Sequence, residues 1–379
     1  MKKYLGRAAV GLLLLLSACT IGSGSPITFT QVRVPTLNSY GSFDAIEVDQ
    51  KAHLLYAADR TATGVDVFDL TSEPATFTHT IELTSSPNGL ALAPDLKRIF
   101  VGMQDGSVAI IDEHDKVIKE VVTGAKGVDL IDYSPSTHEV YAASPDDSMV
   151  ATIDGASGTV RHLIKVPGTG LEQPRYNPVD KTLYVVSPGS GGMFALDPVA
   201  GKVKRKIDLG GCRGRGIAIN TARDQALVAC TDRAVRVNLR DTTDQQQFGD
   251  VVGGDVVSYD AAKDRFLVAT IDTIPSGVAI LGGNPLQHIA TVHTRSGGNA
   301  AALDDQREMV YTADVRYGQS GLIGFPLPAG EPPISIDGSA FVELGLVVGI
   351  IILAMFVVGR LADPIRRPEP MPVRRRRRV

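Results

Sequence analysis

The sequence predicts an all-β protein, a seven-bladed β-propeller of four-stranded antiparallel blades, followed by one C-terminal transmembrane helix. Three observations support this prediction. A short apolar motif recurs seven times along the 379-residue chain. The segments around it contain no long apolar-periodic helix and are rich in Gly, Pro, Asp and Asn, as is typical of short strands joined by turns. Finally, an almost unbroken apolar stretch lies near the C-terminus.

The amino-terminal residues are typical of a processing signal. Three basic residues precede an apolar run over residues 8–16, which is too short to span a bilayer. The run ends in LSAC at residues 16–19, which resembles the lipobox of bacterial lipoproteins. This resemblance implies a signal peptide over 1–18, lipid modification of Cys19 and a linker over 19–26. An ordinary cleaved signal peptide is the alternative.

The central region, residues 27–330, consists of repeats. The second position of each copy forms a series of anchors spaced by 40 to 44 residues: Tyr56, Phe100, Tyr141, Tyr184, Leu227, Leu267 and Tyr311. Each copy supplies an apolar strand, a turn, the anchor strand and two further strands. Four antiparallel strands at this period predict one propeller blade, and stacking of seven blades in a ring buries the faces that one blade alone would expose.

The copy around Tyr184 best shows a further resemblance. Its sequence resembles the YVTN family of bacterial propeller repeats, through Val185, Asp197, Val203 and Lys204. The resemblance covers residues 27–330, although the copies at Leu227 and Leu267 lack the aromatic residue. It implies the propeller fold and no particular activity.

Closure of the ring requires one more strand, because the last repeat supplies only three. Residues 27–34 alternate apolar and polar side chains and are predicted to complete the last blade. Residues 333–337 are the alternative.

The C-terminal segment predicts a second membrane attachment. After a linker over 331–339, residues 340–359 are apolar enough to form a transmembrane helix, and 360–379 form an arginine-rich tail. The positive-inside rule puts this tail in the cytoplasm of a bacterial cell and the propeller on the periplasmic or extracellular side. The tail is expected to contact membrane lipid rather than nucleic acid, since the whole chain carries a formal charge of −4.

The innermost strands of the predicted blades suggest a site. Twelve positions before each anchor the residue is always polar: Asp44, Asn88, Asp129, Glu172, Arg215, Asp255 and Asn299. These seven residues, here called the mouth ring, are expected to meet at one end of the channel. They predict a site for a small polar ligand or a calcium-like divalent cation, with Asn88, Asp129 and Glu172 as candidate metal ligands. A hydrated, purely structural rim is the alternative interpretation.

Two cysteines besides Cys19 fall near one another in the fifth blade. Pairing of the strands through the hairpin after Asn220 places Arg215 opposite Cys230, with Cys212 a short loop away. A disulfide between Cys212 and Cys230 is therefore predicted for an exported protein, with two buried thiols as the alternative.

These features favour a membrane-tethered, non-enzymatic binding or scaffold module. Membrane lipid is expected at both ends, and a protein partner or small polar ligand at the channel mouth. The alternative is a metal-dependent hydrolase of lactone type, because gluconolactonase-type propellers resemble the mouth ring in using Glu, Asn and Asp, although those enzymes have six blades. Motifs for a nucleophile elbow, a phosphate loop, dinucleotide binding or haem attachment do not occur.

Overall fold

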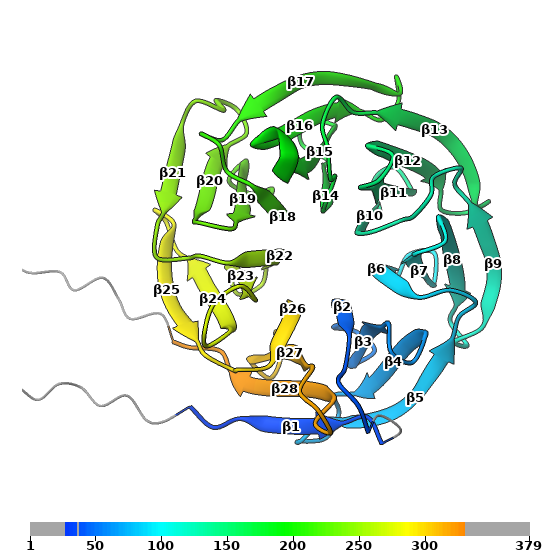
Figure 1. Ribbon diagram of the computed structural model, residues 1–379, viewed down its shortest axis with the longest axis vertical. Helices are drawn as coiled ribbons and strands as arrows, with labels where there is room; N and C mark the ends of the chain where they lie inside the picture. The colour runs from blue at the N-terminus through cyan, green and yellow to red at the C-terminus, as the bar shows by residue number, and fades with distance from the viewer. Residues whose placement is uncertain (1–26, 36–37, 330–379) are drawn as a thin grey trace, which may run out of the picture. The chain divides into compact units, whose positions relative to one another are not determined.

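Seven four-stranded antiparallel sheets surround a common centre, as Figure 1 shows. The computed structural model describes residues 27–35 and 38–329. The innermost strands of blades 1 to 7 are β2 (Phe43–Asp49), β6 (Pro87–Ala93), β10 (Ile131–Ser134), β14 (Pro174–Asn177), β18 (Gly214–Asn220), β22 (Gly254–Asp260) and β26 (Gly297–Asp304). The second strands are β3 (Leu54–Asp59), β7 (Arg98–Met103), β11 (Glu139–Ser144), β15 (Thr182–Ser187), β19 (Gln225–Cys230), β23 (Arg265–Thr270) and β27 (Met309–Asp314).

The outer half of each blade follows the same order. The third strands are β4 (Gly64–Asp69), β8 (Ser107–Asp112), β12 (Met149–Asp154), β16 (Gly192–Asp197), β20 (Ala234–Asn238), β24 (Gly277–Gly282) and β28 (Gly321–Pro326). The outermost are β5 (Thr76–Glu82), β9 (Val117–Val122), β13 (Thr159–Lys165), β17 (Lys202–Asp208), β21 (Gln245–Phe248), β25 (Gln287–Val292) and, in blade 7, β1 (Thr30–Arg33). A short 3-10 helix spans Pro188–Ser190. The predicted seven-bladed propeller is confirmed.

The hydrophobic core lies between blades. Every anchor sits on a second strand and is buried, from fully buried Phe100 to Tyr56 at 7% exposure. Phe100 of blade 2 stacks on Tyr133 of blade 3, and Tyr141 of blade 3 stacks on Tyr176 of blade 4. Because each blade buries its faces against its neighbours, the ring is stable only as a whole.

The turn from the innermost to the second strand is the same in all seven blades. Its last residue adopts a left-handed conformation, with φ between 49° and 56°, at His53, Lys97, His138, Lys181, Asp224, Asp264 and Glu308. In most blades an Asp or Asn at the end of the innermost strand accepts backbone N–H groups of the turn; Asp49, for example, accepts from Lys51 and Ala52. Each of these turns has four residues.

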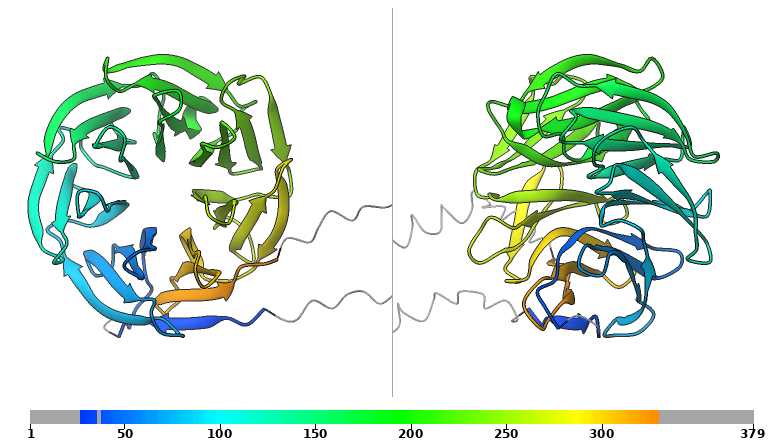
Figure 2. Two further views of the ribbon diagram at one scale, coloured as in Figure 1. Left: turned by 180° about the vertical axis from the view of Figure 1, so that it is seen from behind. Right: turned by 45° about the vertical axis from the view of Figure 1, so that its right-hand side comes forward.

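The strand β1 closes the ring. It pairs antiparallel with β28, from Thr30 opposite Gly324 to Arg33 opposite Gly321, and Phe29 contacts Phe325 edge to face. The predicted closure by residues 27–34 is confirmed, and the alternative segment 333–337 lies outside the described residues. Figure 2 shows β1 and β28 side by side at the outer edge of blade 7.

Cys212 and Cys230 form a disulfide with their Cα atoms 5.5 Å apart. The residue opposite Cys230 is Gly214 and not Arg215, so the predicted register was wrong by one position. The reason is a bulge between Gly214 and Gly216, which leaves Arg215 without a paired residue on β19.

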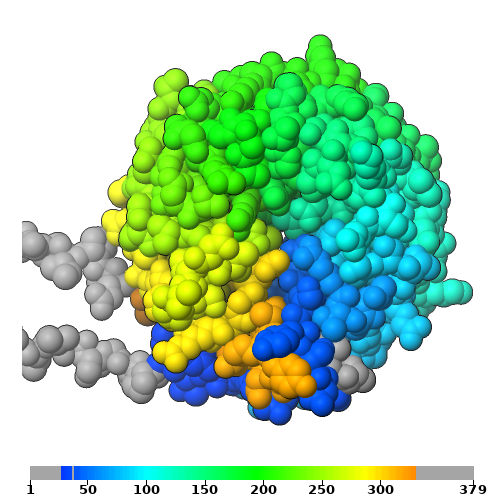
Figure 3. Space-filling model, in the orientation of Figure 1, coloured from blue at the N-terminus to red at the C-terminus, as the bar shows by residue number. Residues whose placement is uncertain are grey.

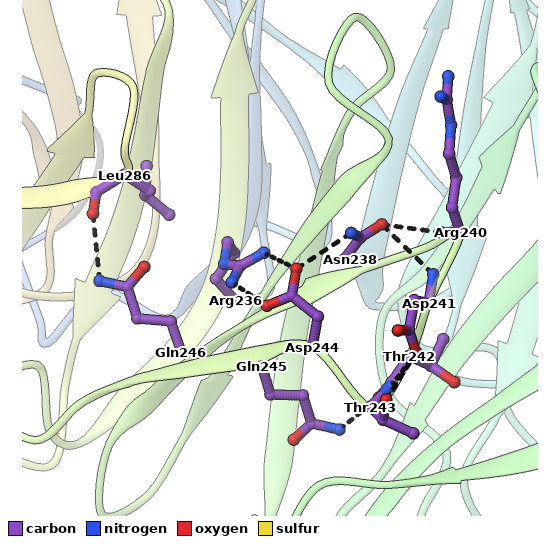
Figure 4. A network of polar contacts seen from close by, with 10 residues as sticks. All are labelled: Arg236, Asn238, Arg240, Asp241, Thr242, Thr243, Asp244, Gln245, Gln246 and Leu286. Atoms are coloured by element: carbon purple, nitrogen blue, oxygen red, sulfur yellow. Dashed lines mark hydrogen bonds and ion pairs between the residues drawn. The ribbon is translucent and has the colours of Figure 1, made fainter.

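The outer edge of blade 5 carries a dense polar network, drawn in Figure 4. Asp244 accepts hydrogen bonds from Arg236 and Asn238, and the Asn238 side chain accepts the N–H groups of Arg240 and Asp241. The network ties the turn between β20 and β21 together. Its polar groups bind one another, and Gln246 donates to the Leu286 carbonyl, so we assign the network a structural role.

The predicted membrane segments are the signal peptide over 1–18, the linkers over 19–26 and 331–339, the helix over 340–359 and the tail over 360–379. All of them lie outside the described residues. Within residues 27–35 and 38–329, no helix is long and apolar enough to cross a membrane.

Candidate functional site

The seven mouth-ring residues lie at the start of the innermost strands, at the same end of the channel. In blades 1, 2, 5, 6 and 7 each lies within a bulge, for example Asp44 between Phe43 and Ile46. A bulge leaves the extra residue without a partner on the second strand and redirects its side chain. In blades 3 and 4, Asp129 and Glu172 come two residues before β10 and β14.

Arg60 connects part of this ring. Counting positions from the anchors does not identify this residue. It lies in the loop between β3 and β4, forms an ion pair with Asp44, and donates to Asn88 Oδ1 over 2.8 Å. Asn299 donates to the other Asp44 oxygen over 3.3 Å, and the Asn88 amide donates to the Val128 carbonyl over 2.8 Å. Burial raises the pKa of Asp44, while the Arg60 guanidinium lowers it.

The other carboxyl groups of the ring interact with one another. Burial raises the pKa of Glu172 to about 9 and that of Asp129 to about 7, and the nearby Asp129 charge adds to the rise at Glu172. Burial, with the nearby Asp44 charge, also raises the pKa of Asp255 to about 7. Arg215 points instead to Asp272, 2.8 Å away in the loop after β23. At neutral pH the ring therefore holds at least one proton.

The ring fits a divalent cation poorly. The Asn88 oxygen already accepts from Arg60, so a cation bound there would lie beside a guanidinium. The residues that the structure describes contain no group of three or more His, Cys, Asp or Glu side chains that could hold a metal ion. The calcium-like site at Asn88, Asp129 and Glu172 remains a prediction, and no chemical step is built on it.

A cavity of about 750 Å³ occupies the opposite end of the channel. It is lined by the second halves of the innermost strands and by the turns that follow them, from blades 1 to 6. We call it the far cavity. Its polar wall includes the charged residues Glu47, Asp132 and Arg175, and the charged Asp49 and Lys51 also line it, with Pro94, Pro135 and Pro178 at its rim. Figure 3 shows that side chains cover most of the central opening on one face of the ring.

The charged residues of the far cavity follow a second repeat position, three residues beyond the one that defines the mouth ring. They are paired directly opposite the anchors, with Glu47 opposite Tyr56, Asp132 opposite Tyr141 and Arg175 opposite Tyr184. The equivalent residues of the other blades are small: Ala91, Ala218, Ser258 and Ala302. Counting nine positions before each anchor, rather than twelve, would have revealed three charges among four small residues, a pattern that leaves the channel open.

The three charged groups of the far cavity are unequally satisfied. Asp132 accepts from Arg175 Nη1 over 3.3 Å and from the Tyr176 backbone N–H over 2.7 Å. Arg175 Nη1 also donates to the carbonyls of Ile131 and Pro174. Glu47 forms no side-chain hydrogen bond or ion pair with any residue of the described chain. Burial raises its pKa to about 7; Arg175 lowers this value and Asp132 raises it.

Gln173 links three blades at a level between the ring and the far cavity. This fully buried side chain accepts the backbone N–H groups of Ile217 and Val257 over 2.9 and 3.1 Å, and donates to the Val257 carbonyl over 3.1 Å. It therefore reaches from blade 4 past blade 5 to blade 6. The link fixes the wall between the two ends of the channel.

Together these features define a β-propeller with two chemically different channel mouths, a fold compatible with a binding or scaffold module. No family model matches the chain, and no curated protein matches its sequence. Among solved structures, it is similar to hydrazine synthase from Kuenenia stuttgartiensis, with a TM-score of 0.66 and 15% identity over 80% of this chain and 99% of that chain. At this identity the similarity shows the fold alone. The resemblance to YVTN repeats stays a prediction.

Proposed function

We propose that this chain is a lipid- and helix-tethered binding module on the outer side of a bacterial cytoplasmic membrane, and that its ligand enters the far cavity. The observation that carries the proposal is a cavity of about 750 Å³ whose wall includes the carboxylate of Glu47, unpartnered within the described residues. Ligand sites are typically concave, mostly apolar and equipped with a few convergent polar groups. The mouth ring has a comparable number of polar groups, but Asp44, Asn88, Arg215 and Asn299 already have side-chain partners. The charges of its other three carboxyl groups, those of Asp129, Glu172 and Asp255, repel one another.

The closure of the ring supports a double tether. Since β1 and β28 pair antiparallel, the chain enters at Ile27 and leaves at Ala329 on the same edge of blade 7. The proposed linkers over 19–26 and 331–339 contain eight and nine residues. Even fully extended, each would reach at most about 30 Å. Lipid on Cys19 and a helix over 340–359 would then hold blade 7 close to the membrane and leave the faces of the ring accessible.

The tether is tested by topology and lipid labelling. A reporter fused after Val379 is expected to be active only in the cytoplasm, and one inserted at Gly330 only outside it. Cys19→Ser should abolish lipid labelling but leave the protein in the membrane fraction. Cytoplasmic activity at both positions would exclude the proposed topology, and release of the Cys19→Ser protein would exclude the helical anchor.

The binding site is tested by comparing its two mouths in one assay. Partners or ligands are captured from crosslinked membranes with the parent protein, with Glu47→Gln, and with Asp129→Asn/Glu172→Gln. Capture that is lost with Glu47→Gln and kept with the ring variant supports the far cavity. The reverse pattern would place the ligand at the mouth ring.

A hydrolase of lactone type is the second candidate, and the paired carboxyl groups of Asp129 and Glu172 are the observation that favours it. A neutral carboxyl with a raised pKa could donate a proton, as general acid catalysis requires. We expect no lactone hydrolysis by the purified protein, with or without calcium. Turnover that disappears in Asp129→Asn/Glu172→Gln would establish the enzyme instead.

A further inference from the structure

The far cavity presents unsatisfied groups of opposite kinds. Glu47 offers both carboxylate oxygens without a partner in residues 27–35 and 38–329. Arg175 uses only Nη1 in its hydrogen bonds within the same residues, which leaves Nε and Nη2 available as donors. No direct ion pair joins Glu47 to Arg175 in the described structure, yet Arg175 is near enough to lower the Glu47 pKa. The cavity thus separates a free acceptor from a free donor.

The rest of the wall offers little competing polar chemistry. The Tyr133 and Tyr259 hydroxyls donate to Asp95 and Asp264, over 2.8 and 3.0 Å, so these side chains already have polar partners. Ser258 donates its hydroxyl to the Ala301 carbonyl over 2.7 Å. Ala91, Leu92, Ala218 and Ile219 add apolar surface. A ligand here would meet Glu47 and Arg175 on a wall that combines apolar and polar side chains.

The formal charge of the polar wall indicates the sign of the ligand. The acidic lining residues are Glu47, Asp49 and Asp132, and the basic ones are Lys51 and Arg175, so their sum is one negative charge when all five are ionised. A cation on Glu47 would neutralise this charge, whereas a phosphate or other multiply charged anion would face three carboxylates. An isolated buried charge is costly, and a bound counter-ion offsets that cost.

We propose that the far cavity binds the amino end of a short peptide, with its ammonium group on Glu47 and a backbone carbonyl accepting from Arg175. This inference rests on the proposed function and names the ligand class of that site. A peptide amino terminus combines one cation with a nearby acceptor, and the cavity volume falls within the range of sites for drug-sized ligands. Its small side chains and backbone would fit the apolar part of the wall.

The decisive probes are Ala-Ala-Ala-amide and its N-acetylated form, titrated by calorimetry into the full chain in detergent at about pH 7, where the peptide amine is mostly protonated. We expect the free peptide to bind and acetylation to weaken binding at least tenfold, since acetylation removes the ammonium group. Equal binding of both peptides would overturn the recognition of ammonium. Butylamine tests the acceptor: if it binds as tightly as the peptide, the carbonyl contact with Arg175 is wrong and the ligand is a simple amine.

Variants link the binding to the two residues. Glu47→Gln should lose at least tenfold in affinity for the free peptide and almost nothing for the acetylated one. Glu47→Asp keeps the charge on a shorter side chain, so its affinity for the free peptide should lie between those of the parent and Glu47→Gln. Asp129→Asn, at the other mouth, is the matched control and should bind like the parent. Thermal melting of each variant shows that it is folded.

The outcomes separate this inference from the proposed function. If no peptide binds the folded parent while capture from membranes still depends on Glu47, the far cavity is a ligand site and the peptide class is wrong. If the peptide binds as expected but the Gly330 reporter is active in the cytoplasm, the ligand class stands and the tethered topology is wrong. If Asp129→Asn weakens binding as much as Glu47→Gln, the ligand does not occupy the far cavity.

Discussion

The two ends of the channel are built from the same seven strands and differ in what surrounds them. At the mouth ring, loops between outer strands bring Arg60 to Asp44 and Asn88 and bring Asp272 to Arg215, and the remaining carboxyl groups raise one another's pKa. At the far cavity, the tight turns contribute no such side chain to Glu47 from the described residues. A count of polar residues therefore does not identify a binding site. The number of partners that each group already has is the better indicator.

The cause of this difference is the geometry of a blade. The turn after an innermost strand has four residues between β2 and β3, and Asp49 just before it is committed to capping that turn. The loops at the other end join strands and blades and can extend over the channel. Small residues opposite four of the seven anchors then leave the far end hollow.

The largest expected effect is the loss of Arg60. Asp44 is 5% exposed, and Arg60→Met would leave it without its cation. Removal of one partner of a buried pair typically costs about 3–5 kcal/mol, and since Arg60 is one-third exposed we expect about 2–3 kcal/mol in urea unfolding. Arg60→Met with Asp44→Asn should recover most of the loss. If Arg60→Met is as stable as the parent, the mouth ring is not held together by this pair.

Removal of the disulfide should have a similar or slightly smaller effect. Cys212 and Cys230 are 18 residues apart, and closing a loop of this size contributes about 3 kcal/mol in the chain-entropy account. The double variant Cys212→Ser/Cys230→Ser should therefore unfold at a lower urea concentration than the parent. Its free energy of unfolding should be lower by about 2–3 kcal/mol. Treatment of the parent with a reductant should reproduce this loss, whereas the double variant should not respond.

The mouth-ring carboxyl groups should make stability depend on pH. The folded pKa values of Asp129, Glu172 and Asp255 are about 7, 9 and 7, above those of exposed carboxyl groups, so the folded protein holds more protons than the unfolded chain from about pH 4 upward. Stability then falls as pH rises through this range. We expect a loss of about 1–2 kcal/mol between pH 5 and 8, or about 2–8 °C in melting temperature.

The double variant Asp129→Asn/Glu172→Gln tests whether the mouth-ring carboxyl groups cause this pH dependence. It should flatten the pH dependence and equal or slightly exceed the parent in stability at pH 8, because it removes two groups whose charges repel. Calcium should change the melting temperature of neither the parent nor the double variant. A calcium-induced rise in the melting temperature of the parent, absent from the variant, would instead establish the cation site by mass action.

The smallest expected effect on stability is that of Glu47→Gln. The substitution removes a half-buried charge that has no partner in the described structure, so the variant should match the parent at pH 6 and gain up to about 1 kcal/mol at pH 8. Peptide binding by the parent should strengthen from about pH 5 to about pH 7 as Glu47 ionises with a pKa of about 7, which Arg175 lowers and Asp132 raises. It should weaken above about pH 8, because the peptide ammonium then loses its proton. Binding that is independent of pH would exclude Glu47 as the ammonium acceptor.

The seven-bladed architecture could be predicted from the sequence alone. Anchors spaced by one blade length defined seven units, and the alternating segment at residues 27–34 identified the closing strand, because strand period and repeat length are local properties of the chain. The same spacing located the mouth-ring residues on the innermost strands. It also brought Cys212 near Cys230, although a one-residue bulge shifted the register.

Which polar groups remain without a hydrogen-bond partner depends on contacts between segments that are distant in the sequence. Arg60 reaches Asp44 from a loop, and Gln173 reaches Val257 two blades away; neither contact follows from the repeat. Glu47 and Arg175 lie at matching repeat positions three blades apart, so their relation depends on the curvature of the closed ring. Local patterns specify strands and turns, whereas the satisfaction of a buried group depends on every segment that packs around it.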